Sequence, residues 1–272
     1  MQELLNTLDN FVRAGVDEII QDKARNLLEE QHNKQPNNTK IIKQDVASKN
    51  TNNQLNIKKE NLISEAVPTN KLILAAKDAA DKAGNLEELK ANLASFDGCA
   101  LAKTANNLVF ADGNENSDLL LIGEAPGASE DEQGIPFCGI SGKLLDDIFK
   151  AIDRKRETNL YITNSIFWRP PGNRRPTAEE IAVCRPFVEK HIALIDPQLI
   201  ILVGSTALNS IFPENEQTIS KIRGTFMKYK NPYLDKELDI TAIFHPSYLL
   251  RQPGKKAVMW DDMLKVRNFL QG

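Results

Sequence analysis

One glycine-flanked loop combines backbone amides with several carboxylates. The segment GEAPGASEDEQGIPFCG, residues 123–139, carries Glu124, Glu130 and Asp131 between its glycines. A loop of this kind usually cradles phosphate, but this one lacks the Lys of a Walker loop and the spacing of a dinucleotide fingerprint. Its acidic side chains would also repel phosphate. The aromatic Phe137 follows a proline, which indicates either a rigidly held ring or an ordinary core residue.

Two more polar groups follow predicted strands. Thr163 and Asn164 lie in LYITNSIF, and His245 to Ser247 follow DITAIF. Each signal alone is weak, because a single His or Asn after a strand is more often structural. Ligands of parallel sheets bind at the carboxyl ends of the strands. We therefore expect these groups to meet the 123–139 loop at one edge of the sheet.

Two basic loops could contact phosphates. The segment WRPPGNRRP, residues 168–176, places three arginines on an extended backbone without an apolar face. The segment SYLLRQPGKK, residues 247–256, couples two leucines with basic residues, as in a wedge that enters a duplex and holds its phosphates. The alternatives are a solvated charged loop in the first case, and in the second the beginning of the last helix's core face.

The surrounding elements alternate in the α/β manner. Short apolar strands are predicted at residues 119–123, 160–167, 199–205 and 239–248. Amphipathic helices are predicted at residues 141–152, 177–195 and about 255–270, with a short helix after residue 204 and a hairpin-like stretch around RGTFMKYK. This order predicts a three-layer α/β/α fold with a central, mostly parallel, four-stranded sheet.

The chain divides into three parts by composition. Residues 1–26 place leucines, valines and isoleucines at helical spacing, which predicts an amphipathic helical segment. Residues 27–70 are rich in Asn and Lys, which predicts a disordered linker. Residues 71–272 form the predicted folded domain, beginning with two helices, the second capped by Asn85.

Charge, hydropathy and cysteine content exclude some classes. A net charge of -3 argues against a protein that coats nucleic acid non-specifically. No run approaches the roughly 20 apolar residues of a membrane span, and the start does not read as a secretory signal. The three cysteines are far apart and indicate neither a disulfide framework nor a complete zinc site. We expect a cytoplasmic protein of the bacterial cytosol or nucleoid with reduced thiols.

The motifs together resemble one family. GEAPGxxED, GxPFxGxxGxLLD, ITNxxxxRPPGNRxP and a late HPxxLLR occur in the order typical of the uracil-DNA glycosylase superfamily, and of its type 4 branch in particular. The resemblance covers about residues 84–270 and none of residues 1–70. It implies an enzyme that extrudes uracil from DNA and hydrolyses its bond to deoxyribose, which leaves an abasic site for base excision repair.

The resemblance also implies roles for single residues. Phe137 would stack on the flipped uracil, Asn164 would read its N3 and O4, and Glu130 would exclude the methyl group of thymine. His245 would donate to uracil O2, with further donors from backbone amides of the 123–127 loop, at Ala125 and Gly127 among others. Glu124 is the first candidate for positioning water or stabilising the sugar cation, with Glu130 and Asp131 next. The alternative is that Glu124 only organises the loop.

Contacts with the DNA backbone are expected around the site. Free N–H groups at the start of the helix beginning with GISGKLL suit a phosphate. The expected DNA-contacting residues are Ser141, Gly142, Arg169, Arg174, Arg175, Ser247, Leu249, Leu250 and Arg251.

The sequence departs from the type 4 pattern at its cofactor. That branch ordinarily holds a [4Fe-4S] cluster through four cysteines. Only Cys99 and Cys184 match the ligand positions, and the other two are Phe96 and Trp168. We predict no cluster, no metal and no other cofactor, with two aromatic rings in the cluster's place. The alternative is a cluster with unusual ligands.

Three other functions are compatible with parts of the sequence. One is an α/β protein that binds nucleotide or phosphate, which the carboxylates disfavour. Another is a damage-binding or product-holding protein of the same fold with weak turnover. The third is a glycosylase for other deaminated bases, hypoxanthine or xanthine. The expected partner is uracil-containing DNA, single- or double-stranded. We expect a monomer without membrane contact. It could dock to a replication or repair protein through residues 1–26.

Overall fold

Four runs of apolar residues form the parallel centre of a six-stranded sheet. The computed structural model describes residues 68–272. In space the strands follow the order β1-β3-β2-β4-β6-β5. The two outer strands pair antiparallel and the four inner strands pair parallel. The strands are β1 (Ala111–Gly113), β2 (Leu119–Gly123), β3 (Tyr161–Asn164), β4 (Leu199–Val203), β5 (Met227–Tyr229) and β6 (Leu238–Ile243).

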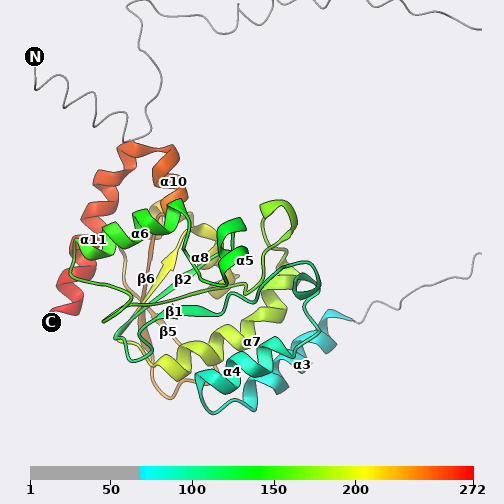
Figure 1. The fold of residues 1–272 in the computed structure, drawn as a ribbon. Helices are drawn as coiled ribbons and strands as arrows, with labels where there is room; N and C mark the ends of the chain where they lie inside the picture. Colours follow the sequence, from blue (N-terminus) through cyan, green and yellow to red (C-terminus); the bar gives the residue numbers. More distant parts are fainter. Residues whose placement is uncertain (1–67) are drawn as a thin grey trace, which may run out of the picture. The chain divides into compact units, whose positions relative to one another are not determined.

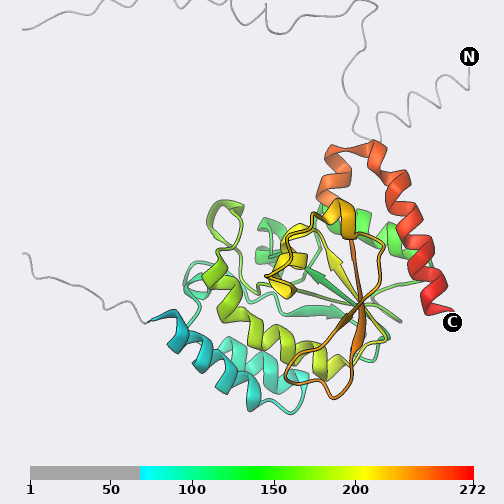
Figure 2. The same cartoon turned by 180° about the vertical axis from the view of Figure 1, so that it is seen from behind.

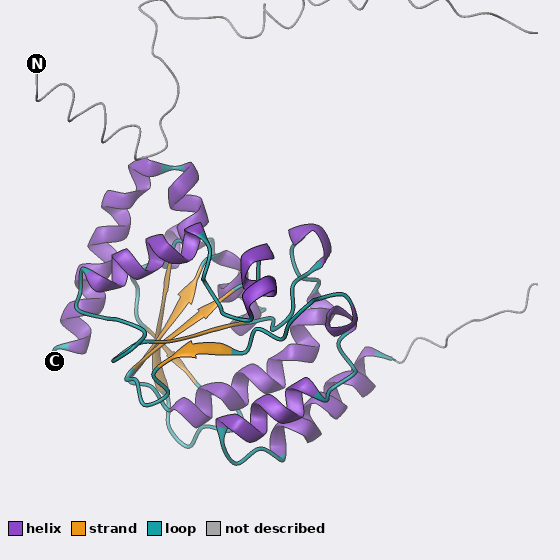
Figure 3. Cartoon of the chain, viewed as in Figure 1, coloured by secondary structure: helices purple, strands orange, loops and turns teal. Residues whose placement is uncertain are grey.

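Helices cover both faces of the sheet (Figure 1). One face carries α3 (Thr69–Asp81), α4 (Leu86–Ala94) and α7 (Ala178–Ile195). The other carries α6 (Ile140–Lys150), α10 (Pro246–Arg251) and α11 (Lys256–Leu270). The same layers are seen from behind in Figure 2 and by type of element in Figure 3. The remaining helices are short: α5 (Ala128–Gln133), α8 (Ser205–Ile211), α9 (Ile219–Ile222), and the 3-10 turns Ala100–Lys103, Pro171–Asn173 and Pro253–Lys255.

The two innermost strands, β2 and β4, contain no polar side chain because both of their faces are buried. Alternate residues of β2 face opposite sides of the sheet. Leu120 and Ile122 pack in the core under α7, whereas Leu119 and Leu121 pack in the core under α6 and α11. This double burial explains why LLLIG contains no polar residue before its terminal glycine.

The predicted helix starts are confirmed by their caps. Thr177 and Glu180 form a reciprocal capping box at the start of α7. Asn85 accepts a hydrogen bond from the backbone N–H of Glu88, as predicted for the start of α4. The Glu88 carboxylate accepts from the backbone N–H of Gly84 at 2.7 Å. Side-chain oxygens thus satisfy amide groups that the helix itself leaves without an acceptor.

The four-stranded prediction is confirmed for the parallel centre and incomplete at the edges. Strands β1 and β5 have only three residues each, too short for a clear alternation of polar and apolar residues. The stretch around RGTFMKYK supplies β5, which forms a hairpin with β6. The first helix within residues 68–272, α3, begins at Thr69, so the last two residues assigned to the linker belong to this helix.

The predictions for residues 1–26 and for most of residues 27–70 lie outside the described residues. Within residues 68–272, no helix has the length and apolar character needed to cross a membrane.

Candidate active site at the carboxyl end of the sheet

A cavity of about 570 Å³ opens at the carboxyl ends of the parallel strands. Strand register explains why distant motifs meet there. Gly123 at the end of β2 pairs with Asn164 at the end of β3. The pairing continues beyond the strands, since the amides of Ser165 and Ile166 donate to the carbonyls of Gly123 and Glu124. The cavity gathers these predicted residues: Glu124, Ala125, Gly127, Glu130, Phe137, Ser141, Asn164, Arg174, His245, Ser247 and Arg251.

Gly123 allows the two base-recognition candidates to pack closely. A Cβ atom added to Gly123 would lie 2.3 Å from Asn164 Oδ1 and 2.6 Å from the Phe137 ring. Both Asn164 and Phe137 are buried. No hydrogen bond to the Asn164 amide from another described residue is found, so its confinement comes from packing. The sequence analysis did not single out Gly123.

His245 is a neutral donor in this site. Its Nδ1 accepts a hydrogen bond from the backbone N–H of Ser247 at 3.1 Å. A backbone amide can only donate, so in the neutral ring the proton must sit on Nε2. Burial and the charge of Arg251 lower the pKa of His245 to about 4. The ring therefore offers an N–H donor without a positive charge at neutral pH. It lies 5.7 Å from the Phe137 ring, centroid to centroid.

The two glutamates of the cavity have different environments. Glu130 Oε2 accepts from the amide of Gly127 at 3.1 Å, and its Oε1 accepts from the amide of Gly139 at 3.1 Å. Glu130 therefore fixes the residue before α5 and the residue before α6. The carboxylate of Glu124 accepts no hydrogen bond from any described residue, and it lines both the main cavity and a neighbouring one of about 340 Å³. Glu124 is thus the carboxylate better placed to hold a water molecule.

One expected donor is occupied. Because the Gly127 amide is bonded to Glu130, it does not face the cavity as a free N–H. The expectation that Gly127 supplies a donor to the leaving base is therefore not supported by its geometry. Its contribution is to close the turn that holds Glu130 in place.

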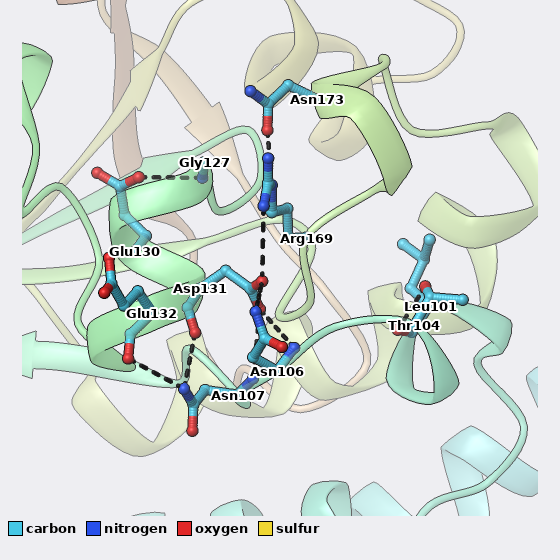
Figure 4. A network of polar contacts seen from close by, with 10 residues as sticks. All are labelled: Leu101, Thr104, Asn106, Asn107, Gly127, Glu130, Asp131, Glu132, Arg169 and Asn173. Carbon is cyan, nitrogen blue, oxygen red and sulfur yellow. Dashed lines mark hydrogen bonds and ion pairs between the residues drawn. The ribbon is translucent and has the colours of Figure 1, made fainter.

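Asp131 is bonded to the loop that carries Asn106 (Figure 4). It is buried, and its carboxylate accepts from the amide and side chain of Asn106, both at 2.8 Å. Arg169 Nη1 lies 3.8 Å from the same carboxylate, and Arg169 Nε donates to Asn173 Oδ1 at 2.7 Å. Neither Asp131 nor Arg169 lines the cavity. This geometry does not support the water-positioning role expected for Asp131, because adjacent side chains on a helix point in different directions and Glu130 is the one that lines the cavity.

The other arginines surround the cavity. Arg174 and Arg251 line it, and Arg175 lines the neighbouring cavity together with Arg251. Arg174 forms a bidentate pair with Glu180, with nitrogen–oxygen distances of 2.6 and 2.9 Å. A phosphate approaching Arg174 would share it with Glu180, whereas Arg251 forms no ion pair within the described residues.

The two phosphate contacts predicted at the start of α6 have different environments. Ser141 lines the cavity, but Gly142 is buried beneath the loop. A Cβ atom added to Gly142 would lie 1.6 Å from the carbonyl oxygen of Phe137. Gly142 is therefore required for packing. Ile140, which the sequence analysis did not single out, is 75% exposed at the cavity wall.

The predicted pair of exposed leucines is wrong for Leu249. Both leucines lie in α10 and not in a loop. Leu249 is completely buried in the core under α6 and α11, whereas Leu250 is 41% exposed. Adjacent helix positions point in different directions, so one leucine serves the core and the other remains available as a wedge.

The four positions that match cluster ligands form an apolar region. Phe96 packs on Phe187 with ring centroids 5.3 Å apart, and Trp168 is buried. Cys99 and Cys184 are buried free thiols. The neighbouring Cys99 and burial raise the pKa of Cys184 well above its ordinary value, which keeps it a thiol. Two thiols and two aromatic rings do not fit a cluster that needs four thiolates.

The comparisons with known proteins agree with this fold. The family model for the uracil DNA glycosylase superfamily matches residues 110–265. The chain belongs to this superfamily.

Its relatives include several type-4 uracil-DNA glycosylases. The enzyme of Sulfurisphaera tokodaii is 34% identical over 67% of this chain and 84% of its own length. The enzyme of Archaeoglobus fulgidus is 35% identical over 67% of this chain and 92% of its own. The enzyme of Thermotoga maritima is 34% identical over 64% of this chain and 88% of its own. The residues that the family model matches, 110–265, all lie within the described part of the chain.

Proposed function

We propose that the protein is a uracil-DNA glycosylase that extrudes uracil from DNA and hydrolyses its N-glycosidic bond, which initiates base excision repair. The observation that carries the proposal is the meeting of Phe137, Asn164 and His245 in one cavity. These side chains supply a stacking ring, a group that reads the base edge and a donor for the leaving base. The similarity to type-4 uracil-DNA glycosylases supports the same activity.

Base recognition follows from hydrogen-bond complementarity. Asn164 Oδ1 would accept from N3–H of uracil, and its Nδ2 would donate to O4. Cytosine presents the opposite pattern on this edge. Gly123 and the Phe137 ring restrict the side chain of Asn164 by contact. Glu130, held by two backbone amides, would exclude the C5 methyl group of thymine by its position and its polarity.

Bond cleavage produces negative charge on the base and positive charge on the sugar. The Nε2–H group of His245 would donate to uracil O2 as negative charge develops there. A neutral imidazole suits this step because it donates a hydrogen bond to the leaving base and keeps its own proton. Glu124 would position the attacking water or stabilise the sugar cation, since its carboxylate is not engaged elsewhere in the described part of the chain.

The DNA backbone would lie across the arginines and the start of α6. Arg174, Arg175, Arg251 and Ser141 lie at or beside the cavity. Contacts from arginine to phosphate position the strand without reading its sequence and weaken with salt. Leu250 would enter the space that the extruded base leaves.

Base release from oligonucleotides tests the proposal. A single uracil should be released by the wild type, while Asn164→Ala and His245→Ala should reduce the rate by 10² or more. Glu124→Gln should reduce kcat similarly, and Asp131→Asn should leave kcat near the wild-type value because Asp131 does not reach the cavity. Tight binding without base release would favour the damage-binding alternative. Faster release of hypoxanthine or xanthine would favour the third function.

We also propose that the protein carries no iron–sulfur cluster. Phe96, Trp168 and Phe187 provide packing where the type 4 pattern has cluster ligands. Anaerobically purified protein should contain no stoichiometric iron and no broad visible absorbance. A stoichiometric visible band would contradict this proposal and favour unusual ligands.

The remaining expectations concern the whole protein in its cell. We propose a cytoplasmic monomer that acts on single- or double-stranded DNA, with residues 1–26 as a docking segment for a replication or repair protein. Light scattering tests the monomer. Binding assays that compare the full chain with a chain lacking residues 1–26 test the docking segment.

A further inference from the structure

The backbone at Phe137 has an unusual conformation. Its φ angle is +52°, in the left-handed region that bulky residues other than glycine rarely adopt. Such a conformation persists only when its surroundings hold it. The carbonyl groups of Pro136 and Phe137 lie on either side of the N–Cα bond of Phe137, and their hydrogen bonds show what holds this conformation. Both are acceptors for one partly buried side chain, Arg156.

Arg156 connects the loop with two other elements. Its Nη1 donates to the carbonyl of Pro136 at 2.7 Å, and its Nη2 donates to the carbonyl of Phe137 at 2.7 Å. On its other sides, Nε donates to Asp146 of α6 at 2.8 Å and Nη1 to Asp112 of β1 at 3.0 Å. The guanidinium therefore joins the loop, a helix and an edge strand.

Two carboxylates face the single charge of Arg156, and both of its bonds to carbonyl groups are made as well. The side chain of Arg156 is only 13% exposed. Burial alone would lower the pKa of Arg156, but Asp146 and Asp112 outweigh it and raise that pKa. A lysine could not replace it, because an ammonium is a point charge and cannot span acceptors in the planar, forked geometry of a guanidinium.

We propose that Arg156 is a positioning residue for base release, because its bonds to the carbonyls of Pro136 and Phe137 hold the Phe137 ring in stacking position. This inference rests on the proposed function. Gly142 lies below the carbonyl of Phe137, and because Gly142 has no Cβ it leaves room for that oxygen. Without Arg156 the Phe137 backbone relaxes toward negative φ, and the ring moves away from Gly123 and Asn164.

A matched pair of variants separates positioning from general stability. Arg154, two residues earlier, is 14% exposed and pairs with Asp118, without contact to the Phe137 loop. Arg156→Gln should reduce kcat for uracil release about 10- to 100-fold, as expected for a misplaced binding group. Arg156→Lys should not rescue kcat, and Arg154→Gln should leave it unchanged. Equal losses in Arg156→Gln and Arg154→Gln, or full activity of Arg156→Lys, would overturn the inference.

A double-mutant cycle tests whether Arg156 acts through Phe137. In a Phe137→Ala background there is no ring to position, so Arg156→Gln should cause little further loss of kcat. Losses that simply multiply would show an independent structural effect and overturn the inference.

Thiol labelling provides a readout that does not require activity. Cys138 follows Phe137 and is half-buried, whereas Cys99 and Cys184 are buried, and the chain has three cysteines in all. Arg156→Gln should speed the reaction of one thiol with Ellman's reagent, while Arg154→Gln should leave the rate unchanged. An unchanged rate, or equal acceleration of all three thiols through unfolding, would overturn the inference. If the wild type releases no uracil, the proposed function fails, and this readout still decides whether Arg156 holds the loop.

Discussion

At the scale of single residues, Gly123 controls the geometry of base recognition. The absence of its Cβ lets Asn164 and Phe137 approach the end of β2. We predict that Gly123→Ala reduces kcat/KM for uracil release at least about 100-fold, because the added methyl group displaces both side chains. Gly84→Ala is the control, since its added Cβ meets only the Glu88 carboxylate, at 3.4 Å. Near-normal activity of Gly123→Ala would contradict the assigned packing.

The protonation state of His245 gives a second prediction at this scale. With its pKa lowered to about 4, the ring is neutral in the folded protein from about pH 5 upward. The pH profile of kcat/KM should therefore show no inflection near 6.5, the ordinary value for histidine. The measurement is uracil release from pH 5.5 to 8.5. An inflection near pH 6.5 that disappears in His245→Asn would show that the ring titrates normally.

At the scale of elements, α10 divides its two leucines between core and surface. Leu250→Ala should reduce release of uracil from duplex DNA about 10-fold, because the wedge stabilises the extruded state and the substituted side chain loses roughly 1.4 kcal/mol or more of apolar contact. Release from single-stranded DNA should change little, since no stacked duplex must be opened.

Leu74→Ala is the control for this experiment. Leu74 is 66% exposed in α3, a helix on the other face of the sheet. Equal effects of Leu250→Ala on both substrates would argue that the residue contributes general binding and not duplex opening.

The same scale shows what could be predicted from sequence. The parallel strands, the capped helices and the meeting of GEAPG, Asn164 and His245 follow from periodicity, cap residues and the rule that strand ends converge. Leu249 lies beside the exposed Leu250, and Asp131 lies beside Glu130, which lines the cavity. Sequence does not reveal which of two adjacent helical residues is buried and which is accessible. Arg156 could not be found, since its acceptors are carbonyl groups 19 and 20 residues earlier, which carry no side-chain signal.

At the scale of the whole molecule, buried histidine makes stability depend on pH. His191 of α7 faces β3, and its Nε2 pairs with the hydroxyl of Tyr161 in that strand at 2.9 Å. Burial lowers the pKa of His191 to about 3. Below pH 6.5 the unfolded chain binds a proton that the folded protein does not, so the free energy of unfolding falls as pH falls from 6.5 toward 3. Between pH 6.5 and 4.5 this residue should lower the free energy of unfolding by about 2 kcal/mol.

A double variant isolates this contribution. Tyr161→Phe with His191→Phe removes both hydrogen-bonding partners and retains aromatic packing against Phe110. Urea unfolding at pH 6.5 and 4.5 should show a smaller acid-induced loss of stability in the variant than in the wild type. His245 and the carboxylates titrate in both proteins, so the difference reports His191. An equal loss in the two proteins would contradict the assignment.

The two edge strands of the sheet have a consequence for how the protein behaves in crowded solution. Strands β1 and β5 contribute three residues each. An exposed edge recruits other chains through its unpaired N–H and C=O groups, and a short edge offers few of them in a row. We therefore expect a variant with a longer β1 or β5 to aggregate sooner in concentrated solution. For the same reason, we expect the short edge strands of this sheet to limit fibril growth.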